Sequence, residues 1–130
     1  MAEQARKSET IVLPWPPSMN RHWRSVPIRG GCRVLISREG RAYRKVVKAR
    51  MPRSSRFPLL GRVSCSIALF APNRRKHDID NRLKPLIDAL QQAGVIGDDE
   101  QIDDLHIWRA GVDKSGGYVE VTLSELKGDT

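Results

Sequence analysis

The segment from Gly61 to Leu90 reads G-R-V-S-C-S-I-A-L-F-A-P-N-R-R-K-H-D-I-D-N-R-L-K-P-L-I-D-A-L. Apolar side chains occupy every second position from Val63 to Leu69, and this alternation predicts a strand over residues 61–71 with one apolar face. Near the end of the segment, apolar residues fall at i, i+3, i+4 and i+7, namely Leu83, Leu86, Ile87 and Leu90. That spacing predicts a helix that buries one stripe, and Gly94 is expected to end it.

Elements on both sides of this segment complete a small α+β domain. Short strands are predicted at Ile11–Trp15 and Arg33–Ile36, with a loop over Ser18–Arg24 between them. Ser37 is expected to cap a basic helix over Glu39–Met51. Two further strands are predicted over residues 102–110 and 118–126, joined by a K-S-G-G turn. The order ββαβαββ predicts a small mixed β-sheet packed with two main helices.

The length and composition of the chain fit one globular unit. With 130 residues the chain can bury one core, which we place at residues 11–126, between flexible termini at 1–10 and 127–130. The first ten residues contain no apolar signal-peptide region, and no stretch is long enough to span a membrane. Cys32 and Cys65 match neither a disulfide framework nor a zinc site, so a cytoplasmic protein with reduced thiols is expected.

The charge of the chain favours an anionic partner. It carries 23 Lys and Arg against 15 Asp and Glu, a formal net charge of +8. Such an excess suits nucleic acid, although a basic surface that serves solubility alone would have the same composition. Charge by itself therefore indicates a class of partner and no chemistry.

Aspartates flank the predicted helix at both ends: Asp78, Asp80, Asp98 and Asp99. In an extended segment, residues i and i+2 point to the same side, so Asp78 and Asp80 are candidates to share one cation. Alternatively, Asp80 only caps the helix, and Asp98 and Asp99 belong to a solvated turn. A carboxylate cluster in so basic a chain suggests metal-assisted chemistry on a phosphodiester, since carboxylates bind hard cations.

Asn81, Lys84 and Asp88 are expected on one helix face, roughly opposite the apolar stripe. A solvated face with an ordinary Lys84–Asp88 pair would have the same spacing. Pro85 is expected to distort the first turn if the helix starts at Asn81, because proline has no N–H to donate.

Other metal sites are excluded by spacing. A calcium loop counted from Asp78 would place Arg82 at a ligand position and Leu83 where glycine is required. The histidines, His22, His77 and His106, lack the spacing of zinc ligands. We interpret His77 as basic or structural. Among the tryptophans, Trp15 and Trp108 are expected to pack in the core, whereas Trp23 suits either packing or base stacking.

Two blocks of the sequence resemble the RusA family of Holliday-junction resolvases. One is R-R-K-H-D-I-D-N-R-L-K-P-L-I-D-A-L-Q-Q-A-G-V-I-G-D-D-E-Q-I, which begins at Arg74, and the other is L-P-W-P-P-S-M-N-R-H-W-R over Leu13–Arg24. The blocks occur in the right order, and the likeness extends from about Ile11 to Leu126. The pattern D-x-D-N-x-x-K, followed by x-x-x-D-A-L and D-D-x-Q, makes the likeness specific.

The resemblance implies a homodimeric, magnesium-dependent endonuclease that nicks four-way DNA junctions, with Mn²⁺ as an alternative ion. Carried over by position, the metal-binding acids are Asp78, Asp80 and Asp99, and the essential lysine is Lys84. For Asp98 two roles stay open, as a further acid of the site or as a residue that only shapes the turn. His77 departs from the family pattern, where Arg or Lys is expected, and this puts a DNA contact in doubt.

Phosphate contacts are expected from Arg74, Arg75, Lys76, Asn20 and Arg21. The basic helix is a further candidate for DNA contacts or a solvated surface. Two rival functions stay open at this point: a metal-dependent nuclease acting on other DNA or RNA structures, and a non-catalytic module that binds branched nucleic acid. A gene carried by a mobile element is compatible with all three.

Overall fold

The computed structural model describes residues 8–53 and 57–126, and within them a mixed four-stranded sheet. Its strands lie in the order β1 (Ser8–Pro14), β6 (Tyr118–Glu125), β4 (Val63–Ala71) and β5 (Ile102–Val112). β4 and β5 run parallel, and the other pairs are antiparallel. The prediction of a mixed sheet in an α+β domain is confirmed.

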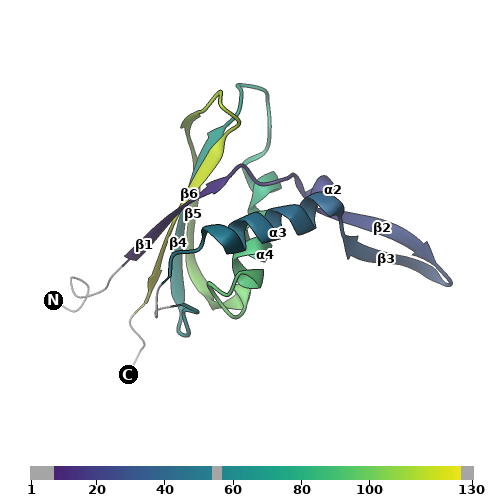
Figure 1. Ribbon diagram of the computed structural model, residues 1–130, viewed down its shortest axis with the longest axis horizontal. Helices are drawn as coiled ribbons and strands as arrows, with labels where there is room; N and C mark the ends of the chain where they lie inside the picture. Colours follow the sequence, from purple (N-terminus) through teal and green to yellow (C-terminus); the bar gives the residue numbers. More distant parts are fainter. Residues whose placement is uncertain (1–7, 54–56, 127–130) are drawn as a thin grey trace.

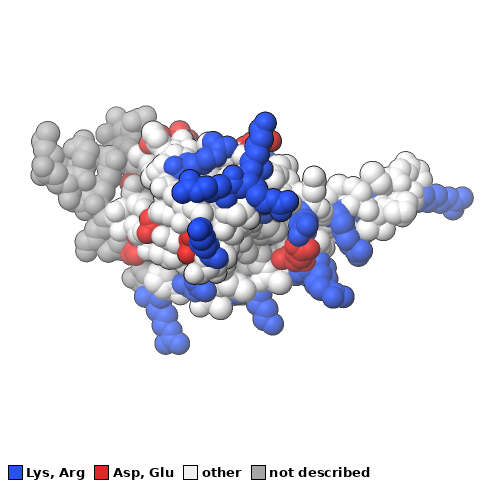
Figure 2. All heavy atoms as spheres, turned by 90° about the horizontal axis from the view of Figure 1, so that it is seen from above, with Lys and Arg blue, Asp and Glu red and all other residues white. Residues whose placement is uncertain are grey.

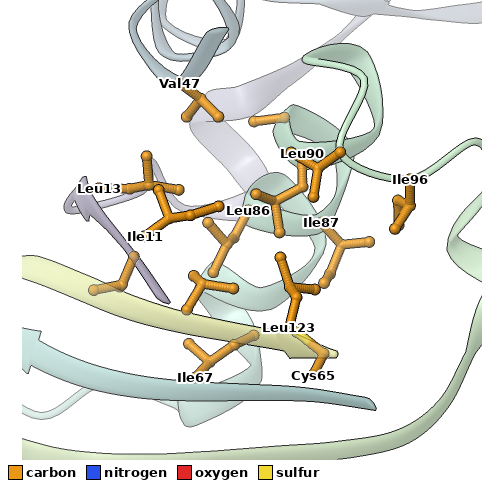
Figure 3. Close-up of a cluster of buried hydrophobic side chains, with 14 of the residues drawn as sticks. Ile11, Leu13, Val47, Cys65, Ile67, Leu86, Ile87, Leu90, Ile96 and Leu123 are labelled. Atoms are coloured by element: carbon orange, nitrogen blue, oxygen red, sulfur yellow. The ribbon is translucent and has the colours of Figure 1, made fainter. Parts of the chain in front are cut away.

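Two helices, α3 (Arg38–Arg50) and α4 (Leu83–Gln92), cover one face of this sheet (Figure 1). The core lies between the sheet and the helices (Figure 3), and its largest fully buried side chains include Leu13, Ile67, Leu69, Leu86, Leu90, Ile96 and Leu123. Each such side chain contributes about 1.5–3 kcal/mol relative to an exposed position. The alternating apolar residues of β4 and the apolar stripe of α4 therefore pack against each other in one core. No helix in the described part of the chain is long and apolar enough to cross a membrane.

The start of α4 resolves the expected distortion at Pro85. A 3₁₀ helix, η1 (Ile79–Arg82), precedes α4, which begins only at Leu83. Pro85 thus lies in the first turn, where a backbone N–H would have no carbonyl partner within the helix. The hypothesis that Asp80 caps the helix is wrong, because Asp80 lies inside η1 and Arg82 holds the capping position of α4.

The N-terminal region contains more structure than predicted. Residues 18–24, expected as a loop, contain a short helix, α2 (Met19–His22). It leads into a two-stranded hairpin of β2 (Trp23–Ile28) and β3 (Gly31–Ile36), which forms a sheet of its own. The turn between them requires a positive φ at Gly30, where it is 87°. β2 escaped prediction because Pro27 interrupts its few apolar residues.

Other elements differ from prediction by smaller amounts. β1 begins at Ser8, inside the segment expected to be a flexible terminus, whereas residues 1–7 and 127–130 lie outside the described residues. Ser37 caps α3 as predicted, since its side chain accepts a hydrogen bond from the Gly40 amide at 2.9 Å.

Trp15 packs against the core as predicted. The prediction for Trp108 is wrong: this residue is 46% exposed, because it lies on β5, an edge strand of the sheet.

Asp88 joins three helices through its carboxylate. Its Oδ2 lies 2.8 Å from Nε2 of the fully buried His22 in α2. Arg44 of α3 donates to the same carboxylate twice, from Nε at 2.8 Å and from Nη2 at 3.0 Å. Burial tends to raise the pKa of Asp88, but the hydrogen bonds from Arg44 and His22 outweigh it, so the pKa lies below its usual value. This cluster takes the place of the Lys84–Asp88 pair considered from the sequence.

Gly40 allows the helices to approach closely at the same place. The Ser37 amide donates to the His22 carbonyl at 2.8 Å, and a Cβ at Gly40 would overlap that carbonyl oxygen and the Ile36 side chain. α3 therefore begins directly against the end of α2.

Replacing Asp88 by Ala is expected to lower the free energy of unfolding by about 2 kcal/mol at neutral pH, because His22 and Arg44 then lose their shared partner. The folded pKa lies below the unfolded value of about 3.9, so the stabilisation is present above that value and is lost as the pH falls through the folded pKa. Urea denaturation of the wild type and the variant across this range measures the effect. The exposed Asp104→Ala variant is the control, and an Asp88→Ala deficit that does not shrink in acid would contradict the assignment.

Candidate active site

Asp78 and Asp80 lie between a basic loop and α4, with both side chains exposed. Asp78 has extended backbone (φ −81°, ψ 140°), but the chain turns into η1 at Ile79. The argument that extended backbone aligns the two carboxylates is therefore wrong for this segment. Neither carboxylate takes part in a hydrogen bond or an ion pair with another residue in the described ranges. In a chain of net charge +8, two such carboxylates are available to bind a cation.

The N-terminal block holds the acidic motif in place. Asn81 accepts a hydrogen bond from the Met19 amide at 3.4 Å through Oδ1. Arg82 donates from Nη1 to the Pro16 carbonyl at 2.8 Å, and its guanidinium lies 5.4 Å from the centre of the Trp15 ring. The two sequence blocks, separated by the 49 residues from 25 to 73, meet at this point. Asn81, expected on a free helix face, instead has this structural contact.

Arg82 is partly buried within this contact. Burial lowers the pKa of Arg82, and the nearby positive charge of Arg21 lowers it further. Arg21 of α2 therefore lies close to the acidic motif, although it is distant in sequence. On the other side of the motif, Arg109 of β5 donates from Nη2 to the His77 carbonyl at 2.6 Å. The Trp15 ring meets the His77 ring edge-on at 5.7 Å, which gives His77 a structural role.

Lys84 occupies the second position of α4 and is exposed. Its ammonium makes no ion pair or hydrogen bond with any residue that the structure describes. Asn81, Lys84 and Asp88 were predicted to share one helix face. Asn81 and Asp88 bind protein groups, so Lys84 alone of the three is free to contact a ligand.

Asp99 lies at the opposite end of α4. Its backbone amide donates to Oε1 of Gln91, in the last turn of the helix, at 3.2 Å. A helix of ten residues is about 15 Å long, so α4 separates Asp99 from Asp78 and Asp80. Over residues 8–53 and 57–126, no three His, Cys, Asp or Glu side chains are grouped closely enough to hold a metal ion. The three acids predicted to form one site are not assembled within one chain.

Asp98 shapes the turn before β5, which is one of the two roles left open from the sequence. It caps the short 3₁₀ helix η2 (Asp99–Gln101) by accepting from the Glu100 amide at 3.0 Å. That hydrogen bond, with the neighbouring Asp99 carboxyl, lowers the pKa of Asp98. Gln101 completes a capping box by accepting from the Asp98 amide at 2.9 Å.

The predicted phosphate contacts fall on two surfaces. Arg74, Arg75 and Lys76 are exposed and line a depression of about 460 Å³ together with Arg109. Figure 2 looks onto this side of the molecule and shows Lys and Arg side chains extending from much of it. Asn20 and Arg21 are exposed on α2, where they border two other depressions near the base of the hairpin.

Several residues that build the site were missed from the sequence. His22, Arg44, Arg82 and Arg109 all act through hydrogen bonds to residues far along the chain. No local spacing indicates such contacts. The one available signal was that His22 and Arg82 belong to the two blocks that carry the family resemblance.

Comparison with known proteins identifies the family of the chain. A sequence model described as Endodeoxyribonuclease RusA matches residues 14–124. The chain belongs to the RusA family. Among its relatives, the crossover junction endodeoxyribonucleases of Enterobacteria phage HK97 and of Escherichia coli K12 are 39% and 38% identical over 119 and 122 residues, each covering 90% of this chain and 94% of the relative.

A further relative, the crossover junction endodeoxyribonuclease of Enterobacteria phage 82, is 41% identical over 122 residues, which cover 89% of this chain and 93% of the relative. The resemblance identified from the two blocks is thus confirmed along nearly the whole chain. The matched range, residues 14–124, spans the positions of the candidate acids and of Lys84.

Proposed function

We propose that two copies of this chain bind a four-way DNA junction and resolve it by paired symmetric nicks, with Mg²⁺ held by Asp78, Asp80 and Asp99. The observation that carries the proposal is the RusA family match over residues 14–124. The relatives from two phages and from enterobacteria further support a gene carried by a mobile element and action on DNA in the cytoplasm.

The donor set fits a hard divalent cation. Mg²⁺ is bound through one or a few carboxylates and keeps several waters, and the exposed Asp78 and Asp80 side chains leave room for both. Mn²⁺ accepts the same oxygen ligands. When bound, such an ion lowers the pKa of a coordinated water and stabilises charge on the phosphate oxygens.

The remaining residues position the DNA. Arg74, Arg75 and Lys76 border the acids on their N-terminal side, where guanidinium and ammonium groups can hold the phosphates next to the scissile bond. The free ammonium of Lys84 is suited to orient the attacking water or to neutralise charge that develops on the phosphoryl oxygens. Arg109 holds the main chain at His77 and so fixes the end of the basic loop.

A second copy is needed to complete the carboxylate set, because α4 separates Asp99 from the other two acids. β5 is suited to be the contact, since it is an edge strand with Leu105 41% and Trp108 46% exposed. The acids at 98–104 lie at its N-terminal end, whereas Arg109 and the basic loop lie at its C-terminal end. Antiparallel pairing of two β5 strands would place the acidic end of each copy beside the basic end of the other. Two-fold symmetry would also relate the two cuts.

The first test replaces a proposed metal ligand. Asp80→Asn is expected to reduce junction cleavage about a hundredfold or more, because an amide binds Mg²⁺ poorly, while junction affinity stays within about threefold. A labelled immobile junction and a matched duplex, each with Mg²⁺ or EDTA, measure both quantities, and Glu120→Gln, on the inner strand β6, is the control.

Junction binding without nicks by the wild type would contradict catalysis and favour a binding module. Equal cutting of the duplex would instead identify a nuclease of another specificity. An Asp80→Asn protein that cleaves normally would remove Asp80 from the site.

The second test concerns the contact between copies. Trp108→Glu is expected to shift the protein from dimer to monomer in sedimentation experiments and to abolish paired nicking, because two charges would then face each other across β5. Val12→Glu is a matched control, since Val12 is 47% exposed on the other edge strand, β1. A Trp108→Glu protein that stays dimeric would place the contact elsewhere.

A further inference from the structure

The β2–β3 hairpin extends away from the body of the molecule (Figure 1). It forms a separate two-stranded sheet, and its six-residue strands give it a length of about 20 Å. Its base is held firmly, because His22 directly before β2 binds Asp88 and the Ser37 amide directly after β3 donates to the His22 carbonyl. The hairpin is therefore a projecting arm with a fixed base.

The arm carries positive charge and no negative charge. Residues 23–36 contain three arginines, Arg24, Arg29 and Arg33, and no Asp or Glu. All three are exposed, and none makes an ion pair or a hydrogen bond with another residue of the described segments. Two apolar side chains on the arm are also well exposed, Ile28 at 51% and Val34 at 63%. These exposed groups are available to a ligand.

The base of the arm lies beside the proposed site. The Met19 amide of α2 donates to Asn81, which follows Asp80 in the chain. Trp23 and Arg24 at the start of the arm border a depression of about 570 Å³ with Asn20. The positive surface thus continues from α2 onto the arm, at a fixed position relative to the acids.

We propose that the β2–β3 hairpin is a DNA-binding arm that grips the duplex next to the branch point of the junction, an inference that rests on the proposed function. A two-stranded ribbon fits the major groove, which is about 12 Å wide. Guanidinium groups on such a ribbon bind the phosphates along the groove. Ile28 and Val34 supply apolar contact with the groove edges, which distinguishes the arm from a plain charged surface.

The affinity test removes charge from the tip. The double variant Arg29→Ala/Arg33→Ala is expected to bind the junction about tenfold more weakly and to lower the slope of log affinity against log salt by about 2, since each phosphate contact contributes about 0.9. Arg53→Ala/Lys114→Ala, which removes two exposed positive charges outside the arm, the basic loop and α3, is the matched control.

A label on the arm tests its position directly. Cys32 is exposed on β3, whereas Cys65 is buried and burial raises its pKa to about 12, so a thiol-reactive dye at neutral pH modifies Cys32. The junction carries an acceptor dye near its branch point, and EDTA is present to prevent cutting. Energy transfer from the dye on Cys32 to this acceptor is expected to rise with protein concentration and to give the same affinity as a direct measurement of junction binding.

If the Arg29/Arg33 variant has normal junction affinity and a normal salt slope, and the labelled protein shows no energy transfer, the proposal for the arm is overturned and the proposed function is not. A change in the fluorescence of the dye itself that appears with rising protein concentration in the absence of DNA would show that the arm contacts another copy. That result would also overturn the proposal for the arm. Failure of the unmodified protein to bind any junction would overturn the proposed function itself.

Discussion

The carboxylate of Asp88 connects parts of the chain that are otherwise independent. It binds His22 from α2 and Arg44 from α3, and it belongs to α4 directly after the acidic motif. Through His22 this contact fixes the N-terminal block and the base of the hairpin against α4. A buried histidine and a bidentate arginine around one carboxylate allow few other arrangements, since each group would lose its partner. The positions of Asp78, Asp80 and Lys84 relative to the hairpin depend on this contact.

The length of α4 sets a second constraint. The same ten-residue helix that completes the core holds Asp78 and Asp80 at one end and Asp99 at the other. One chain therefore holds the acids of the proposed site in two separate groups, one next to exposed basic residues and the other at an open strand edge. Pairing two copies would join the two groups twice, which matches a reaction that needs two cuts related by symmetry. The exposed Trp108 and the separation of the acids then have one common explanation.

The sequence predicted those features that depend on local periodicity. The alternation in β4, the stripe in α4 and the Ser37 cap were readable because burial repeats every two or every 3.6 residues. The Asp88 cluster was not, since its partners lie 44 and 66 residues away and the same spacing suits a solvated face. The exposure of Trp108 follows from the strand order, which periodicity does not contain. The acids themselves were found from their sequence pattern. The distance between Asp99 and the other two acids could be seen only from the structure, in which α4 runs from one group to the other.

Mixing two inactive variants tests most directly whether one site draws on two chains. Asp80→Asn and Asp99→Asn are each expected to be inactive on a labelled four-way junction with Mg²⁺. In a mixed dimer, one of the two sites would combine the intact Asp78 and Asp80 of one copy with the intact Asp99 of the other. Our account predicts that mixing restores nicking, with a single cut per junction. A mixture that forms mixed dimers and stays inactive would contradict it, because each site would then lie within one chain.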